Sequence, residues 1–355
     1  MSQFWSQRTL ELDPYTPGEQ PKDSQYIKLN TNENPYPPSK QVQQAIIDAS
    51  DDQLRLYSDP NSNALKQSIA DYYQVPVEQV FVGNSSDEVL AHTFVALLKH
   101  DAPLLFPDIS YGFYPVYCKL FNIEAKKIPL DENFSIQASD YAIPNGGIIF
   151  PNPNAPTGIA LGLDTIKEIL NNNPNSTVVI DEAYVDFGAE SAITLIADYP
   201  NLLVVQTFSK SRSLAGLRVG FAVGHPELIE GLERVKNSFN AYPLARNAIA
   251  GGVASIQDKA SFEANRKKII TTREHTQQAL KKLGFKTLDS RANFIFAKPP
   301  KGYSAESVYL GLKDKNILVR YFNKPRIDQY LRITIGTDTE IEHLITALQQ
   351  LIPSS

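Results

Sequence analysis

The chain has 355 residues, 42% of them hydrophobic and 21% charged, a composition typical of ordinary globular enzymes. This length allows a sizeable core and favours two domains. The formal net charge is −5 and charges of both signs are spread along the chain, which argues against a general nucleic-acid binder. The single cysteine, Cys118, excludes an intramolecular disulfide, and with five scattered histidines no metal site is expected.

The first residues lack the charged-then-apolar pattern of a signal peptide, and no apolar run reaches the length of a membrane span. We therefore expect a cytoplasmic protein that binds neither nucleic acid nor membranes. The net charge does not exclude small anionic substrates, because a few local arginines can bind them.

The first forty residues are rich in Pro, Asn and Tyr and are expected to form an irregular arm. Two helices are predicted next. Gln41–Ala49 carries apolar residues on one helical face, and Ala64–Tyr73 follows the helix-start signal at residues 59–63.

A repeating pattern of short apolar strands and helices follows. Strands are predicted at 80–82, 103–107, 146–150, 176–180, 202–206 and 219–223. Helices are predicted at 87–98, 111–120 and 163–170. Apolar strands that alternate with helices indicate an α/β fold with a mostly parallel sheet covered on both faces.

The pattern changes after about Leu244. One long helical stretch is predicted at 244–283, followed by strands at 294–297, 317–320 and 331–335 and helices at 305–313 and 340–351. This set indicates a smaller α+β domain. We expect an arm at residues 1–40 that packs with the small domain, a large domain at 41–245 and a small domain at 246–355.

Three residues near predicted strand ends form a recognisable set. Asp181 ends an apolar strand, Tyr184 follows it by three residues, and Lys210 lies in a loop between two apolar strands. A lysine amine can form a Schiff base with pyridoxal 5′-phosphate (PLP), and an acid can pair with its pyridine nitrogen. An isolated Asp181 would also serve as a helix cap, and a single tyrosine or lysine is more often structural or solvated; the combination favours the cofactor.

The cofactor phosphate needs donors, and the segment from Phe81 to Glu88 offers them. It runs from a strand through glycine and small polar residues into a helix, whose N-terminus binds anions. An ordinary helix cap is the alternative for this turn. Ser209 and Arg218 would complete the phosphate site, with Arg218 as a forked donor.

Two further residues follow predicted strands. Tyr111 opens a helix and could stack on the cofactor ring, although a core aromatic is an equal alternative. Asn154 lies in a turn-rich loop and could hydrogen-bond the ring oxygen beside Tyr184.

These motifs resemble the class II branch of the fold-type I PLP-dependent aminotransferases over essentially the whole chain. The resemblance rests on Leu29–Tyr36, on Asp181–Tyr184, on Ser209-Lys210 with Arg218, and on Leu331–Thr337, which occur in the family's order. It implies the fold-type I architecture, a homodimer and ping-pong transfer of an amino group through Lys210.

The resemblance also implies roles for individual residues. Lys210 would be the Schiff-base lysine and proton shuttle, Asp181 the partner of the pyridine nitrogen and Tyr184 that of the ring oxygen. The other implied cofactor ligands are Ser85, Ser86, Tyr111, Ser209, Arg218 and, from the partner subunit, Tyr57. Substrate would be bound by Asn32, which lies in the N-terminal substrate motif, and by Arg332 with Arg320 and Tyr15 as helpers.

The substrate pair implied by the resemblance is histidinol phosphate with 2-oxoglutarate, converted to imidazole acetol phosphate and glutamate in histidine biosynthesis. One position departs from the family: Ala155 stands where many relatives carry the asparagine that contacts the ring oxygen, so either Asn154 substitutes or the contact is lost. The alternatives are an aromatic amino acid aminotransferase, a phosphothreonine decarboxylase of the same fold, and a non-catalytic binding protein that keeps the fold.

Overall fold

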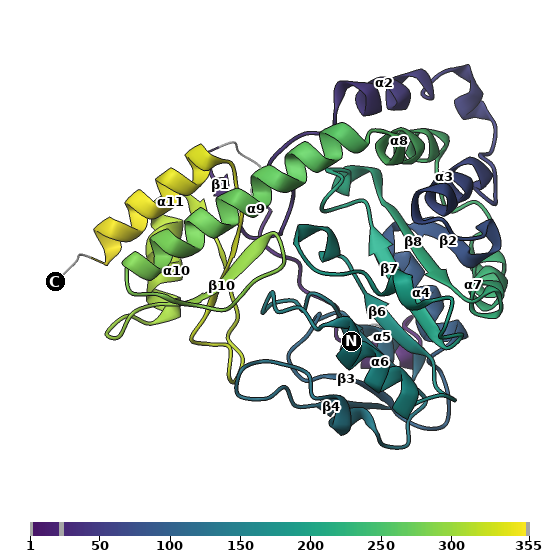
Figure 1. The fold of residues 1–355 in the computed structure, drawn as a ribbon, viewed down its shortest axis with the longest axis horizontal. Helices are drawn as coiled ribbons and strands as arrows, with labels where there is room; N and C mark the ends of the chain where they lie inside the picture. The colour runs from purple at the N-terminus through teal and green to yellow at the C-terminus, as the bar shows by residue number, and fades with distance from the viewer. Residues whose placement is uncertain (1–2, 21–24, 353–355) are drawn as a thin grey trace.

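The computed structural model describes residues 3–20 and 25–352. Its largest element is a seven-stranded sheet with strand order β2-β8-β7-β6-β5-β3-β4 (Figure 1). β8 runs antiparallel to its neighbours β2 and β7, and the other pairs are parallel. The prediction of a mostly parallel sheet is confirmed. Its strands are β2 (Val80–Asn84), β3 (Leu104–Pro107), β4 (Ala125–Ile128), β5 (Gly147–Pro151), β6 (Val178–Asp181), β7 (Leu202–Thr207) and β8 (Val219–Gly224).

Helices cover both faces of this sheet, and successive side chains of each strand alternate between the faces. In β6, Val178 and Ile180 enter one core and Val179 enters the other. The first core lies under α2 (Lys40–Asp48), α3 (Asn63–Tyr73), α6 (Leu163–Asn172) and α8 (Arg246–Gln257). The second lies under α4 (Ser85–Ala96), α5 (Tyr114–Phe121) and α7 (Pro226–Phe239). Burial on both sides explains why the inner strands of this sheet are largely apolar.

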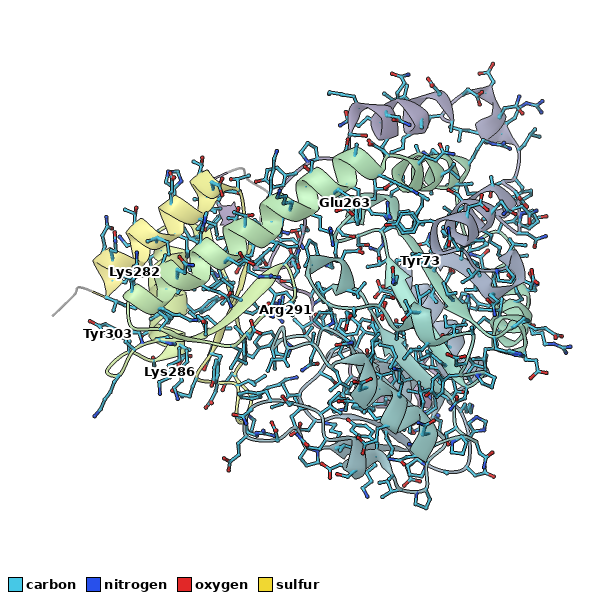
Figure 2. The ribbon with its side chains drawn as sticks, viewed as in Figure 1. Tyr73, Glu263, Lys282, Lys286, Arg291 and Tyr303 are labelled. Carbon is cyan, nitrogen blue, oxygen red and sulfur yellow. The ribbon has the colours of Figure 1, made fainter. Side chains whose placement is uncertain are left out.

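A smaller antiparallel sheet with order β12-β13-β10-β9 lies at the other end of the molecule (Figure 1). One face of this sheet packs in a core of its own, and Phe296 of β10, on the other face, joins the first core of the large sheet. Its strands and helices are β9 (Lys286–Thr287), β10 (Phe294–Lys298), α10 (Ala305–Asp314), β12 (Arg320–Tyr321), β13 (Leu331–Thr334) and α11 (Asp338–Leu351). The long helix α9 (Lys259–Lys282) reaches it from the helices of the large sheet, and Figure 2 labels Glu263 and Lys282 near its two ends.

The separate cores support a division of the chain into two domains. We propose the expected division, with an arm at 1–40, a large domain at 41–245 and a small domain at 246–355, in which α8 is the connecting helix that packs on the large sheet. Within residues 3–20 and 25–352, the structure contains no helix with the length and apolar character that crossing a membrane requires.

The N-terminal arm is more ordered than expected and contacts both parts of the molecule. Its helix α1 (Gln7–Glu11) lies beside α5, where Nη1 of Arg8 donates to the carbonyl oxygen of Lys119 at 3.2 Å. Its strand β1 (Ile27–Lys28) pairs in parallel with β11 (Ile317–Leu318). The expectation of an irregular arm was therefore wrong in these two segments.

Two other expectations need correction, and some elements were not predicted. The helical stretch predicted at 244–283 is two helices, because Asp258 leaves helical geometry and its side chain caps α9 by accepting from the amide of Ser261. The strand predicted at 317–320 is divided between β11 and β12, which belong to different sheets. Strand β4 and helix α7 were not predicted: β4 is an edge strand with exposed lysines, and α7 buries only a narrow apolar stripe.

Candidate active site

Strand β6 ends in a buried carboxylate, Asp181, and the buried Glu182 follows it. Because side chains alternate along a strand, the two point to opposite faces of the sheet. Asp181 lies on the side of α5, where the hydroxyl of Tyr114 donates to its Oδ2 at 2.9 Å. Among the residues that the structure describes, its Oδ1 is buried without a hydrogen-bond partner.

Burial raises the pKa of Asp181 to about 6, the negative charge of Asp87 adds to the rise, and the hydrogen bond from Tyr114 opposes it. A buried carboxylate with an unpaired oxygen is unfavourable unless a cation or a donor completes it. A protonated pyridine nitrogen is such a donor, so the surroundings of Asp181 suit the predicted cofactor.

Lys210 lies in the turn after β7 and is partly buried. Its Nζ donates to the carbonyl oxygen of Thr31 at 3.2 Å and lies 5.9 Å from the centroid of the Tyr184 ring. The side-chain amide of Asn34 donates to the carbonyl oxygens of Lys210 and Ser211, both at 3.1 Å. The segment that follows β1 thus holds the lysine turn at the edge of the large sheet.

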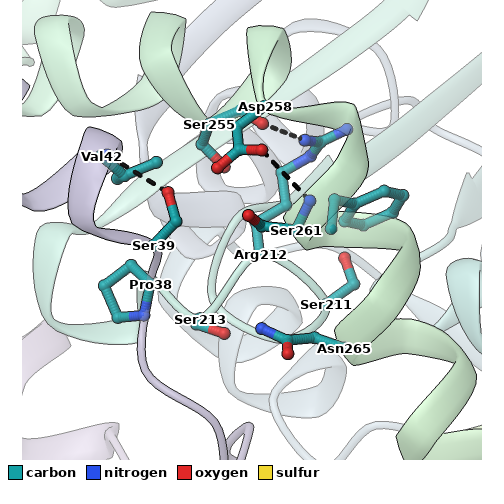
Figure 3. A pocket seen from close by; sticks show the side chains of 11 residues that line it. Pro38, Ser39, Val42, Ser211, Arg212, Ser213, Ser255, Asp258, Ser261 and Asn265 are labelled. Carbon is teal, nitrogen blue, oxygen red and sulfur yellow. Dashed lines mark hydrogen bonds between the residues drawn. The ribbon is translucent and has the colours of Figure 1, made fainter.

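A small pocket lies beside the residues that follow Lys210, between the turn at 211–213 and helices α8 and α9 (Figure 3). Here the buried Arg212 donates from Nη1 to the carbonyl oxygen of Ser255 at 2.7 Å. Its guanidinium carbon lies 4.3 Å from the centroid of the Phe262 ring, within range of a cation–π contact. These contacts anchor the lysine turn to the helices.

Tyr184 faces Lys210 from the loop after β6. Its hydroxyl accepts a hydrogen bond from Nδ2 of Asn32 at 2.9 Å, which leaves its own hydrogen for another acceptor. Its ring packs edge-on against Phe294, with the centroids 5.0 Å apart. Asn32 has a left-handed backbone (φ 57°), and its side-chain oxygen accepts from Thr334 at 3.0 Å. Residues from the arm and the small sheet therefore orient the predicted cofactor ligand.

The turn between β2 and α4 is the segment predicted to bind the cofactor phosphate. Nη2 of Arg218 donates to Oγ of Ser85 at 2.8 Å and to Oδ2 of Asp87 at 2.7 Å. Gly220 of the neighbouring β8 approaches so closely that a Cβ there would lie 2.3 Å from the amide nitrogen of Ser86. Only glycine allows this approach, which places the start of α4 beside the arginine.

Ser209 and Tyr111 lie in the loops that follow β7 and β3. The hydroxyl groups of Ser209 and Thr207 are hydrogen-bonded at 3.0 Å. The hydroxyl of Tyr111 donates to Oδ1 of Asp87 at 3.1 Å, and its ring meets that of Tyr114 edge-on at 5.5 Å. Tyr111 is thus joined through these two neighbours to both the predicted phosphate-binding turn and Asp181.

Asn154 is buried in the loop after β5, with both amide hydrogens already used. Its Nδ2 donates to the carbonyl oxygen of Ile109 at 3.0 Å and to Oγ1 of Thr157 at 3.1 Å. Donation to a cofactor oxygen would require it to release one of these bonds. The neighbouring Ala155 packs beside Phe294 in a small cluster that also includes Tyr184.

Arg332 and Arg320 lie opposite each other on β13 and β12. Nη2 of Arg332 donates to the carbonyl oxygen of Asn30 at 2.8 Å, and its buried Nε has no hydrogen-bond partner within residues 3–20 and 25–352. Burial lowers the pKa of Arg332, the charge of Arg320 adds to this, and Tyr184 and Tyr15 oppose it. Arg332 therefore lies within electrostatic range of Arg320, Tyr15 and Tyr184.

Tyr57 stands apart from these residues within one chain. It is 79% exposed, and its ring stacks on that of Tyr242 with the centroids 4.5 Å apart. Its carbonyl oxygen accepts from Nη2 of Arg246 at 3.3 Å.

Three contributors to the site were not predicted from the sequence. Tyr114 and Asp87 complete the chain of contacts from Asp181 to Arg218, and the main chain of Thr31 holds the lysine amine. Asp87 had a weak signal, since acids favour the first turn of a helix. Tyr114 had none, because it lies inside an expected helix and its partner is 67 residues away.

The family model of the class I and II aminotransferases matches residues 24–348 of the chain. Curated histidinol-phosphate aminotransferases of Pseudomonas syringae and Hydrogenovibrio crunogenus are 58% and 60% identical to it, and each alignment covers 99% of this chain and at least 99% of the relative.

A solved structure of similar fold is that of histidinol-phosphate aminotransferase from Sinorhizobium meliloti in complex with pyridoxal 5′-phosphate. It superposes with a TM-score of 0.83 at 22% identity and covers 92% of this chain and 90% of the other. Aspartate aminotransferase from Thermus thermophilus superposes with the same score at 18% identity and covers 99% of both chains. The predicted fold-type I architecture is thereby confirmed. The chain belongs to the aminotransferase class I and II family and, within it, to the histidinol-phosphate aminotransferases.

Proposed function

We propose that this protein is a PLP-dependent aminotransferase that transfers an amino group from histidinol phosphate to 2-oxoglutarate in histidine biosynthesis, yielding imidazole acetol phosphate and glutamate. The observation that carries the proposal is Oδ1 of Asp181, buried without a partner among the described residues, at the same sheet edge as Lys210 and Tyr184. Full-length identity of 58–60% to enzymes named for this substrate supports it.

The residues present fit the cofactor. When bound, PLP supplies an electron-withdrawing ring that stabilises negative charge on the substrate's α-carbon. Asp181 would keep the ring nitrogen protonated, and the hydroxyl of Tyr184, already oriented by Asn32, would donate to the ring oxygen. The remaining contacts would come from Tyr111 and Asn154 at the ring and from Ser85, Ser86, Ser209 and Arg218 at the phosphate.

Lys210 would move the proton. Its amine donates to the carbonyl oxygen of Thr31 and lies 5.9 Å from the centroid of the Tyr184 ring, so it is near the residue that would contact the ring oxygen. A lysine amine held at the reacting carbon can accept a proton there and return it to a neighbouring atom, which is general acid–base catalysis by one group. Burial raises the pKa of Glu33, but hydrogen bonds from Lys28 and Thr31 bring it below its ordinary value, and the charge of Lys210 adds to this lowering.

Arg332 would bind the anionic end of each substrate. Its Nε lacks a partner among residues 3–20 and 25–352, and its guanidinium carbon lies 5.5 Å from the centroids of both Phe294 and Phe322. A planar cation held by aromatic rings suits a carboxylate or phosphate. Arg320, Tyr15 and Asn32 would assist, as expected from the sequence.

Borohydride reduction of the holoenzyme, followed by peptide mapping, tests the cofactor assignment. The label is expected on the peptide that contains Lys210, and the variant Lys210→Ala should lose both the label and the activity. A label on another amine, or none, would overturn the assignment.

Steady-state kinetics test the substrate. Histidinol phosphate should be turned over with 2-oxoglutarate at a far higher kcat/KM than phenylalanine, and phosphothreonine should release no CO2. Efficient turnover of phenylalanine without histidinol phosphate would favour the aromatic aminotransferase, and release of CO2 without a keto acid would favour the decarboxylase. Binding of PLP with no turnover of any of the three would favour a binding protein.

We also propose a cytoplasmic homodimer in which Tyr57 reaches the active site of the partner subunit. Its 79% exposure and its stacking on Tyr242 support this role, because a large exposed aromatic pair is typical of an interface. Subunit mixing is the test. Lys210→Ala and Tyr57→Ala proteins should each be impaired, and their mixture should regain activity, because one site of each mixed dimer receives an intact lysine and an intact tyrosine. No recovery from an exchanged mixture would contradict the shared site.

A further inference from the structure

The turn that carries Tyr184 and the turn that carries Lys210 are joined by a direct side-chain contact. Oγ of Ser211 donates to Oδ2 of Asp186 at 2.5 Å. Asp186 lies two residues after Tyr184, in the 3-10 turn Val185–Phe187, and Ser211 directly follows Lys210. We propose that Asp186 is a positioning residue, which holds Ser211 and thereby sets the separation between the Lys210 amine and the Tyr184 ring. This inference rests on the proposed function of those two residues.

Ser211 is held by several contacts besides that with Asp186. A change in the contact with Asp186 would therefore affect the position of Lys210. It is 3% exposed, and its carbonyl oxygen accepts from Nδ2 of Asn34, which also binds the carbonyl oxygen of Lys210. The next residue, Arg212, is anchored to α8 through the carbonyl oxygen of Ser255. A shift of Ser211 would therefore move the main chain of Lys210 and not merely a flexible side chain.

The opposite end of the contact is equally fixed. Phe187 is fully buried in the core of the small sheet, and its carbonyl oxygen accepts from Nη1 of the buried Arg273 at 2.7 Å. The carbonyl oxygen of Asp186 accepts from Nη1 of Arg266 at 3.3 Å. Asp186 therefore links a turn anchored in the small-sheet core to the lysine turn of the large sheet.

The two turns have independent anchors, which separates positioning from folding. Phe187 secures one turn and Arg212 the other, so neither requires the bond between Asp186 and Ser211 to stay folded. What depends on that bond is the distance between the turns. Near-attack geometry is sensitive at this scale, and a displacement of about 1 Å can lower a rate by roughly a hundred-fold.

Variants of both partners test the inference. Asp186→Ala and Ser211→Ala should each lower kcat roughly ten-fold or more with little change in KM, because substrate contacts stay while the reacting groups shift. The double variant should resemble either single variant, since both remove one interaction. Asp186→Asn keeps an oxygen acceptor of the same shape and should recover most of the rate. Glu190→Ala, which removes an exposed carboxylate of the same segment, is the matched control.

Hydrogen–deuterium exchange of the cofactor-free proteins supplies a second measurement. Asp186→Ala and Ser211→Ala should both raise exchange in residues 184–188 and 208–214, with the Glu190→Ala protein unchanged. Unchanged kcat, additive losses in the double variant, or faster exchange in one turn only would overturn the inference while the wild-type enzyme stays active. An inactive wild type would refute the proposed function instead, and exchange would still decide whether Asp186 couples the turns.

Discussion

Asp181 and Glu182 are neighbours at the end of β6 but lie on opposite faces of the sheet. The two acids differ in their hydrogen bonds. Glu182, 2% exposed, accepts from Oγ of Ser191 and the amide of Ala192, both at 2.6 Å, and from Nε2 of Gln206 at 2.9 Å. Gln206 in turn accepts from the hydroxyl of Tyr73, which is labelled in Figure 2. Asp181 is 4% exposed, and among the described residues its one side-chain hydrogen bond comes from Tyr114.

Burial alone therefore does not distinguish a structural acid from a functional one. Burial raises the pKa of both groups, that of Asp181 to about 6 and that of Glu182 to about 7. The difference lies in their hydrogen bonds: both oxygens of Glu182 are paired, whereas Oδ1 of Asp181 lacks a partner among the described residues. An acid whose two oxygens are both hydrogen-bonded within the protein stabilises the fold. An acid with an oxygen that lacks a partner can accept a hydrogen bond from a ligand.

The largest effect should come from Asp181→Asn. This change should lower kcat roughly a thousand-fold, because it removes the charge that keeps the cofactor ring electron-withdrawing. At pH 7 the cofactor-free variant should be more stable than wild type by roughly 2 to 3 kcal/mol, since the pKa rise from 3.8 to about 6 measures the unfavourable charge that is removed. Kinetics and urea unfolding check the two results, and parallel losses of rate and stability would contradict the assigned role.

Glu182→Ala should have the opposite effect on stability and a smaller effect on activity. Loss of the carboxylate leaves a cavity and leaves the donors of Ser191, Ala192 and Gln206 without their acceptor, and these costs should exceed the gain from removing a buried charge, so the free energy of unfolding should fall by about 1 to 3 kcal/mol. The kcat of the folded fraction should fall less than in Asp181→Asn. Chemical denaturation and active-site titration measure the two quantities, and a stable but inactive variant would remove the contrast between the acids.

The pH dependence of stability should separate the same two groups. The folded-state pKa of each is raised, from 3.8 to about 6 and from 4.5 to about 7, so between about pH 4 and pH 7 the folded protein binds more protons than the unfolded one. The contribution of these acids to the free energy of unfolding therefore falls as pH rises through this window. Asp181→Asn should remove the lower part of the decline, as measured by urea unfolding of cofactor-free protein. An unchanged profile would disprove the link.

The smallest effect should come from Tyr114→Phe, which removes the hydrogen bond to Asp181 and keeps the ring. It should change the free energy of unfolding by about 1 kcal/mol and raise the pKa of Asp181 further, because that bond opposes the rise. Urea unfolding across pH measures both. A larger loss of stability than in Glu182→Ala would contradict the order of effects.

Much of the fold could be predicted from local sequence patterns. The strands around Val178–Asp181 and Leu202–Thr207 are short and apolar because both faces are covered, and this signal requires no knowledge of distant contacts. Lys210, Asp181 and Tyr184 could be proposed as site residues because they lie next to such strands. Arg218 followed from its position shortly after the lysine.

Contacts between segments that are distant in the sequence could not be predicted from local patterns. The bond from Tyr114 to Asp181, the carbonyl of Thr31 at Lys210 and the contact of Asp186 with Ser211 each join segments whose local patterns carry no sign of the partner. Strand β4 was missed because an exposed edge strand has little apolar pattern.

By itself, the sequence determined most strands of the large sheet, the order of the motifs and the residue types available for binding a cofactor, because periodicity and strand-end chemistry are local properties. Only the tertiary structure decided which of two adjacent acids keeps an unpaired oxygen and which is fully hydrogen-bonded. That choice depends on the donors that other strands and helices bring to each face, and hydrogen-bond partners of a buried group are set by packing in three dimensions.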